Sequence, residues 1–413
     1  MSNCSEICSV RPLHSRRCGR LSRLGFLAVL LAAITCTAVV AAPFVPVDDA
    51  QVLERLPIRA NDPVARELRA LRVVLATDPN NTSAALDLAW RYFELAMAEG
   101  DPRYIGYAQA ALGPWWTLVS PPQAVLTLRG VLRQYKHEFG PALTDLAAAT
   151  AADPTDVNAW SWRAAIHLVQ ADYSASRADC EGLRPHASAL RLAGCIASVD
   201  GVSGRARAAH HMLASALAQE KSAPPGLKLW MHTRLAEFSQ RLGEHAQAER
   251  HFKLALAQGV TDQFLLAAYA DLLLDAGRGK EVLVMLKESV RSDVLLLRLA
   301  LAAKATGSKE LTEYADALQA RFDAAALRGD KLHLQEQARF LLHVQGKPRE
   351  ALAVARENWR AEQREPRDAR ILLEAALAAG DAAGAAPALQ WLSSSAHEDP
   401  LLRQLAGRLE KLP

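Results

Sequence analysis

The chain has 413 residues, of which 50% are hydrophobic, and a formal net charge of +3. So much apolar material excludes an intrinsically disordered protein, and the length predicts either several domains or one elongated repeat array. Alanine and leucine dominate while β-branched and aromatic residues are sparse, which favours helices because Ala and Leu lose little conformational freedom in one.

The positive charge lies at the start of the chain. Residues 1–42 hold five arginines and one acid, Glu6, which leaves 43 basic and 44 acidic residues in the rest. A near-neutral body lacks the basic surface that binds nucleic acid. The composition therefore predicts that nucleic acid is not a partner.

The same residues 1–42 have the pattern of a targeting segment. Arginines precede an apolar run from Leu24 to Ala42 that ends in small residues. This predicts a signal peptide, cleaved after Ala41. The alternative is an uncleaved N-terminal membrane anchor, because the run is just long enough to span a bilayer. Either way the arginines predict a body outside the cytoplasm: periplasmic or secreted after cleavage, or in the periplasm and tethered to the inner membrane.

Residues 43–61 are predicted to be a linker, and residues 62–413 a helical repeat domain. Asp62 can cap a first helix that begins at Pro63 and runs to Asp78. Beyond it apolar residues recur at i, i+3, i+4 and i+7, with Gly and Pro between the helices and no strand signal. A last helix is expected from Asp399 to Leu412.

Residues that can end a helix recur at a regular interval along the chain. Residues suited to ending the first helix of a pair are separated by 37, 34, 30, 42, 34, 30, 39 and 34 residues. They are Gly100, His137, Ala171, Gly201, Gly243, Gly277, Gly307, Gly346 and Gly380. Seven residues earlier stand small residues in five of the units: Gly130, Ala164, Ala236, Ala270 and Ala300. Large apolar residues stand nine residues after the ends in four units: Leu146, Phe252, Leu286 and Leu389.

These positions and the period near 34 resemble the tetratricopeptide-repeat (TPR) family. The resemblance covers roughly residues 60–413 and suggests an exported bacterial protein of this type. It implies an all-α, right-handed superhelical solenoid of antiparallel helix pairs, with about nine degenerate repeats and a capping helix at each end. The register is least regular near residues 90–115 and 300–345.

In this family a partner peptide usually lies in the concave groove lined by the first helix of each pair. By resemblance, ten residues of this chain face that groove: Trp90, Gln134, Tyr135, Trp230, Glu237, Gln240, Arg241, Asp271, Phe340 and His343. Their mixture of aromatic rings and charges of both signs suits an extended or helical peptide segment. No row of Lys or Arg that would grip a terminal carboxylate is present.

Only two cysteines, Cys180 and Cys195, follow the leader. In an exported domain such a pair predicts a disulfide. In the repeat architecture the two lie on consecutive antiparallel helices on either side of the turn at Pro185, and can therefore face each other. The alternative is a pair of buried free thiols.

No arrangement of residues predicts chemistry. The histidines are scattered and lack the spacing of a metal site, so neither metal nor cofactor is expected, and no catalytic residue is assigned. The adjacent Trp115 and Trp116 are expected to pack between repeats, or to form a binding edge. The favoured function is a non-catalytic scaffold of the bacterial envelope, for complex assembly or maturation. The alternative is an accessory subunit of an envelope enzyme, or a degenerate helical-solenoid glycan-processing enzyme.

Overall fold

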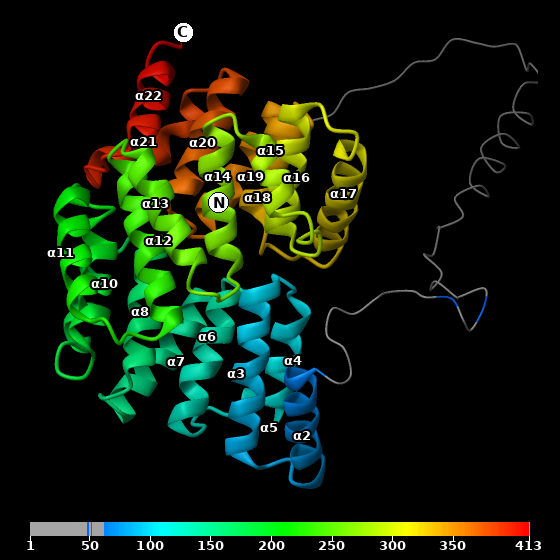
Figure 1. The fold of residues 1–413 in the computed structure, drawn as a ribbon, viewed down its shortest axis with the longest axis vertical. Helices are drawn as coiled ribbons and strands as arrows, with labels where there is room; N and C mark the ends of the chain where they lie inside the picture. Colours follow the sequence, from blue (N-terminus) through cyan, green and yellow to red (C-terminus); the bar gives the residue numbers. More distant parts are fainter. Residues whose placement is uncertain (1–47, 49–50, 52–61, 413) are drawn as a thin grey trace, which may run out of the picture. The chain divides into compact units, whose positions relative to one another are not determined.

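The computed structural model describes Asp48, Gln51 and residues 62–412, so the predicted leader and nearly all of the predicted linker lie outside the described residues. The chain divides into the units Met1–Arg59 and Ala60–Pro413. Residues 62–412 form helices and turns without any strand (Figure 1). None of the described helices is both long and apolar enough to cross a membrane.

The helices pack in consecutive pairs, so the predicted all-α solenoid of helix pairs is confirmed. The first helices of the pairs are α3 (Thr82–Glu99), α6 (Gln123–Tyr135), α8 (Val157–Val169), α10 (Ala189–Asp200), α12 (Pro225–Arg241), α14 (Gln263–Asp275), α16 (Asp293–Thr306), α18 (Leu334–Arg339) with the π-helical η1 (Phe340–Val344), and α20 (Pro366–Ala379). The second helices are α4 (Arg103–Ala111), α7 (Phe139–Ala152), α9 (Tyr173–Leu183), α11 (Ala206–Gln219), α13 (His245–Leu256), α15 (Gly279–Met285), α17 (Leu311–Leu327), α19 (Pro348–Arg360), and α21 (Ala386–Ser394) after the 3₁₀ turn η2 (Ala383–Ala385).

Single helices lie outside the pairs. The array begins with α2 (Pro63–Thr77), whose first turn is capped because Asp62 accepts a hydrogen bond from the Val64 N–H at 2.8 Å. It ends with α22 (Pro400–Leu409), which Asp399 caps in the same way. The short α5 (Gly113–Trp116) follows α4.

The helix ends predicted from the spacing are left-handed turns in eight of nine places, with φ between 58° and 74°. Two of these residues, His137 and Ala171, are not glycine and hold a conformation that L-residues rarely adopt. The exception is Gly201, whose φ is −65°. There the chain makes a longer turn and Gly204, at φ +76°, takes the left-handed position instead.

Small residues let the two helices of a pair approach each other, as the spacing predicts. A Cβ added to Gly130 would lie 2.7 Å from Cγ of Leu146 on the partner helix, closer than real atoms come. The equivalent Ala164, Ala236 and Ala270 are buried as well. Close approach of the backbones is what joins the helix pairs into a continuous core.

Polar side chains also join the pairs. On α6, the 3% exposed Arg129 donates to both carboxylate oxygens of Asp145 on α7, at 2.7 and 2.8 Å. It also donates to three backbone carbonyls in the segment that precedes α6, including that of Trp115 at 3.1 Å. The same ion pair recurs one repeat later between Arg163 and Asp179. Trp115 itself is buried, which supports its packing role.

The two predicted disulfide partners, Cys180 on α9 and Cys195 on α10, lie at bonding distance. Their Cα atoms are 5.6 Å apart, within the usual range of a disulfide. Both side chains are buried in the apolar cluster that also contains Leu183 and Val199. The bond therefore ties the second helix of one pair to the first helix of the next.

The solenoid coils back on itself, which the sequence did not predict. Helix α14 packs against α3 (Figure 1). Further along, the Arg364 N–H donates to the Val169 carbonyl at 3.0 Å, and Nε1 of Trp391 donates to the hydroxyl of Tyr173 at 2.7 Å. Repeats from the two halves of the array are consequently in direct contact.

Candidate functional site

A cavity of about 200 Å³ opens beside α12 and α14. Its walls come from α12, α14 and α16 and from the beginnings of α20 and α22, helices that the coiling brings together. Five arginines and five carboxylates line it: Arg234, Arg241, Arg298, Arg367, Arg370, Glu237, Asp271, Asp275, Glu365 and Asp399. Two of these charged side chains, Arg241 and Arg298, are buried, and charges are rarely buried unless they are paired.

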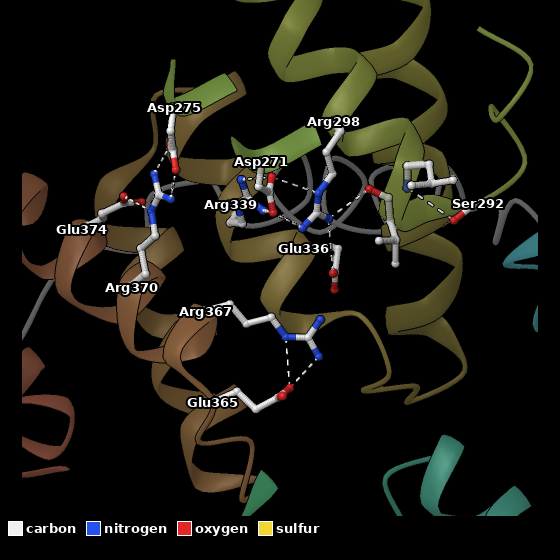
Figure 2. Close-up of polar contacts among 12 residues, drawn as sticks. Asp271, Asp275, Ser292, Arg298, Glu336, Arg339, Glu365, Arg367, Arg370 and Glu374 are labelled. Atoms are coloured by element: carbon white, nitrogen blue, oxygen red, sulfur yellow. Dashed lines mark hydrogen bonds and ion pairs between the residues drawn. The ribbon is translucent and has the colours of Figure 1, made fainter. Parts of the chain in front are cut away.

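One side of the cavity is a bridge from α14 to α16 and α18 centred on Asp271 (Figure 2). Arg298 donates to its carboxylate at 2.7 and 3.1 Å, and Arg339 at 2.9 and 3.1 Å. Burial alone would raise the pKa of Asp271, but the two guanidinium groups outweigh it and hold that pKa well below its usual range. The aspartate is therefore permanently ionised.

A second bridge joins α14 to α20 (Figure 2). Arg370 binds Asp275 through two hydrogen bonds of 2.7 Å and also donates to Glu374 at 2.7 Å. His343 of η1 lies 2.8 Å from the same Glu374. Burial favours the neutral form of Glu374, yet His343 and Arg370 bring its pKa down to about 2.

The α12 wall is less completely paired. Arg241 is 8% exposed and donates from Nη1 to the Gly201 carbonyl at 3.1 Å. Its nearest acid is Glu237, whose Oε2 lies 3.9 Å from Nη2 and 2.9 Å from Nη1 of Arg234. Nε of Arg234 is buried without a hydrogen-bond partner. Burial lowers the pKa of Arg241, because the neighbouring carboxylate only partly compensates its charge.

The opposite wall is formed by the first residues of α20 and α22. Glu365 accepts two hydrogen bonds from Arg367 on one oxygen, Oε2, at 2.7 and 3.1 Å (Figure 2). Asp399 uses Oδ1 to cap α22. Between the walls the ring of Phe264 is flanked by two guanidinium groups, those of Arg234 at 5.0 Å and Arg367 at 5.6 Å.

This arrangement can bind and orient a polar group but is poorly suited to moving protons. Groups such as Asp271 and Glu374 stay ionised at neutral pH, whereas a general acid or base needs a pKa near the working pH. Asp368 does have such a value, since burial raises its pKa to about 7. However, it is hydrogen-bonded to Asn358 of α19 and does not line the cavity. Within residues 62–412 no cluster of three or more His, Cys, Asp or Glu is arranged to hold a metal ion.

Four of the ten groove residues implied by the resemblance line this cavity: Glu237, Gln240, Arg241 and Asp271. His343 lies at its edge through the contact with Glu374. Gln134 is half-buried and is not part of the lining.

The aromatic residues of the predicted groove pack between repeats. Trp90 and Tyr135 both contact the ring of Phe93, at centroid distances of 5.8 and 6.5 Å. Trp230 packs over Gly194 of α10. These rings are half-buried and contribute to helix packing rather than to the cavity.

The prediction for Phe340 is wrong. Its side chain is 1% exposed and packs on Phe322 in the core. The cause is the π-helical turn η1, which places one extra residue between this position and the helix end at Gly346. Counting back from Gly346 with the α-helical period therefore points to Phe340, which is one residue too late in the chain. The inward position belongs to Arg339, which binds Asp271.

Other cavity residues were missed because they come from the start of helices on the far wall. Glu365 stands directly before Pro366, and Asp399 directly before Pro400. A proline at such a position indicates the start of a helix but not a binding site. Nothing in the repeat spacing indicates that these starts lie opposite α12. A usable signal was the arginine content of α20, where Arg367 and Arg370 stand one helical turn apart.

No protein-family model and no curated protein matches the chain. Solved structures do resemble it. The crystal structure of the APC/C hetero-tetramer Cut9-Hcn1 has 10% identity and a TM-score of 0.49 over 84% of this chain and 66% of that one, so this chain spans just under two thirds of its length. A tetratricopeptide repeat protein from Parabacteroides merdae has 12% identity and a TM-score of 0.31, over 84% of this chain and all of that one. The P58(IPK) TPR domain has 14% identity and a TM-score of 0.21, over 84% and 98%.

Proposed function

We propose that this protein is a non-catalytic scaffold of the bacterial envelope that holds a partner protein or peptide on its concave side. The observation that carries the proposal is the cavity between α12, α14, α20 and α22, which five arginines and five carboxylates line, among them the ionised Asp271. Rigid, preorganised charges recognise a partner through electrostatic complementarity and hydrogen bonds. They supply orientation and specificity without a covalent step.

Location in the envelope is supported by the leader and by the cysteines. The arginine-flanked apolar run in residues 1–42 is typical of exported proteins. A disulfide between Cys180 and Cys195 persists in an oxidising compartment and is rare in a reducing one. A reporter that is active only after export, fused at residue 60, is expected to be active. Activity of a reporter that works only in the cytoplasm, fused at the same residue, would contradict export.

Partner binding can be tested by placing a photo-crosslinking amino acid at Gln240, a half-buried residue of the cavity. Irradiation of cells is expected to produce a discrete crosslinked species of the full chain with one partner. The matched control carries the same amino acid at Glu313, an exposed residue on α17 that is not part of the cavity. Equal crosslinking at both positions, or none at Gln240, would contradict the use of the cavity as a binding site.

A further inference from the structure

The fold gathers three histidines that are scattered in the sequence. His210 of α11, His232 of α12 and His251 of α13 form a row, which we call the histidine joint. The ring centroids of His210 and His251 lie 5.5 Å apart, and those of His251 and His232 lie 5.6 Å apart. Helix α12 packs against both α11 and α13. The joint therefore lies where two consecutive helix pairs meet.

The hydrogen bonds of the histidine joint depend on neutral imidazole rings. Nε2 of His210 accepts a hydrogen bond from the side-chain amide of Gln247 at 2.8 Å, and a protonated ring has no lone pair for such a bond. The Nδ1 atoms of His232 and His251 are 3.3 Å apart, so in a hydrogen bond one of them carries a proton and the other does not. When both rings are charged, two N–H groups and two positive charges face each other.

The charged groups around the joint oppose protonation. In the described chain, three basic side chains, one acidic side chain and a further histidine face the three rings. They are Arg207, Glu244 and His211 beside His210, Lys228 beside His232, and Arg250 beside His251. The one acid, Glu244, is itself paired with Arg207 at 3.0 Å. The ion pairs of histidine within residues 62–412 all involve other histidines, so a proton added to the joint gains no close carboxylate.

The joint therefore binds protons less readily than an unfolded segment does. Burial lowers the pKa of all three histidines, and the neighbouring His232 and His210 help to bring that of His251 down to about 4. The ordinary pKa of a histidine is 6.5. The packed joint is consequently most stable above about pH 6.5, and its stability is lost as the pH falls toward 4, because the opened form takes up protons over this range.

The joint lies behind the cavity. Three side chains of α12 line the cavity: Arg234, Glu237 and Arg241. They follow His232 in the same helix at positions that lie about 140–200° around the helix axis from it. The back of α12 thus contacts α13 through the histidines, while its front forms a wall of the cavity. Packing at the joint supports this wall.

We propose that the histidine joint is an acid-sensitive switch that regulates the cavity. At neutral pH the uncharged rings hold α11 and α13 against the back of α12. Below about pH 5 the joint opens, α12 loses this support, and the cavity releases its partner. The release of a partner rests on the proposed function, because it takes the cavity as the binding site. The opening of the joint does not.

Hydrogen–deuterium exchange of the full chain, followed by mass spectrometry at pH 7 and pH 4.5, tests the opening. The triple variant His210→Gln, His232→Gln, His251→Gln keeps polar side chains that do not titrate. Comparison with the wild type at each pH cancels the pH dependence of intrinsic exchange. From pH 7 to pH 4.5, the protection of α11, α12 and α13 in the variant relative to the wild type should rise on the order of 50-fold from His251 alone. A ratio that does not change with pH overturns the proposal.

Two further variants keep the test decisive. If the triple variant does not fold, His251→Gln replaces it, because the pKa of this histidine is strongly lowered. His186→Gln removes an exposed histidine outside the joint and should behave like the wild type. The location is checked in α6 and α7, whose protection should not depend on the joint. An equally large pH-dependent difference in α6 and α7 would overturn the assignment to the joint.

Photo-crosslinking at Gln240 tests the regulation separately. In isolated envelopes, the crosslinked partner should be lost from the wild type at pH 4.5 and retained by the triple variant. Crosslinking that persists equally in both proteins at pH 4.5 overturns the regulation of the cavity. Absence of crosslinking at pH 7 contradicts the proposed function instead, and the exchange experiment then still decides whether the joint opens.

Discussion

Two buried arginines show how differently this fold treats charge. Arg129 on α6 binds both oxygens of Asp145 and three backbone carbonyls. Arg241 on α12 is nearly as buried but donates to one backbone carbonyl, and its nearest carboxylate is 3.9 Å away. The first arginine has its hydrogen-bonding capacity used within the fold. The second retains capacity for a group that the fold does not supply.

This difference distinguishes structural burial from functional burial. A buried charge is tolerated when partners surround it, and it is destabilising when they do not. Proteins keep incompletely paired charges mainly where they bind or react. We therefore interpret the charges around α6 and α7 as stabilising the solenoid. The cavity beside α12 is interpreted as its binding site.

The largest effect is expected from Arg129→Met. Removal of the guanidinium leaves the buried Asp145 with only Arg133, at 2.7 Å, and frees three carbonyls. The loss in free energy of unfolding should be about 3–5 kcal/mol, as for other broken buried pairs. Urea denaturation measures it. Arg133→Met, at a more exposed site on the same aspartate, is the control and should have a smaller effect. A loss below about 1 kcal/mol for Arg129→Met would show that this region does not depend on its charge network.

Loss of the disulfide should have the next largest effect on the same region. The bond between Cys180 and Cys195 closes a loop of 15 residues, for which chain entropy suggests about 3 kcal/mol of stabilisation. Guanidinium denaturation with and without a reductant measures it, and the Cys180→Ala, Cys195→Ala double variant should be insensitive to the reductant. Alkylation of both cysteines in the unreduced native protein would show that they are free thiols and would also weaken the proposal of export.

A smaller, pH-dependent effect is expected at Asp368, behind the cavity wall. Burial raises its pKa from 3.8 to about 7 in the folded protein, so folding favours the protonated form. The contribution of Asp368 to the free energy of unfolding is fully present below about pH 4, where the carboxyl is protonated, and is lost as the pH rises through 7. Asp368→Asn removes the charge but also one of the two acceptor oxygens that bind Asn358 and the Glu365 N–H. The difference in free energy of unfolding between variant and wild type should therefore shift in favour of the variant, by on the order of 1–2 kcal/mol, between pH 4 and pH 8. Melting temperatures at both pH values measure this, and a pH-independent difference would contradict it.

The smallest effect on stability is expected from Arg241→Met, which is the direct counterpart of Arg129→Met. Because Arg241 lacks a close ion-pair partner, replacing it with an apolar side chain of similar length removes a desolvated charge and leaves no closely paired acid behind. Loss of the hydrogen bond to the Gly201 carbonyl opposes the removal of this desolvated charge, so the free energy of unfolding should change by less than about 1 kcal/mol in either direction. Urea denaturation of Arg241→Met and of Arg129→Met, side by side, measures the difference between their free energies of unfolding. Similar large losses in both variants would mean that the two arginines serve the same structural purpose.

The sequence was informative wherever a local rule decided the structure. Helix ends such as Gly243 and Gly277 follow from the need for a left-handed residue, and the caps at Asp62 and Asp399 follow from unpaired N–H groups. Glu237, a position counted along a regular helix, lines the cavity.

Prediction failed where the helix was irregular or where contacts were distant. The π-helical turn at η1 moved the inward position from Phe340 to Arg339, and the longer turn after α10 moved the left-handed residue from Gly201 to Gly204. The far wall of the cavity depends on contacts between residues nearly two hundred positions apart, such as the bond from Arg364 to Val169. Repeat spacing describes neighbours only, so it carries no information about them.

The contact between successive turns of the solenoid limits how this protein can evolve. In an open repeat array, each unit touches only its neighbours, so a repeat can be gained or lost with little harm. Here one added repeat between α9 and α19 would carry Tyr173 out of reach of Trp391 and Val169 out of reach of Arg364. The number of repeats is then held constant by geometry. Contacts between residues so distant in the sequence also slow folding.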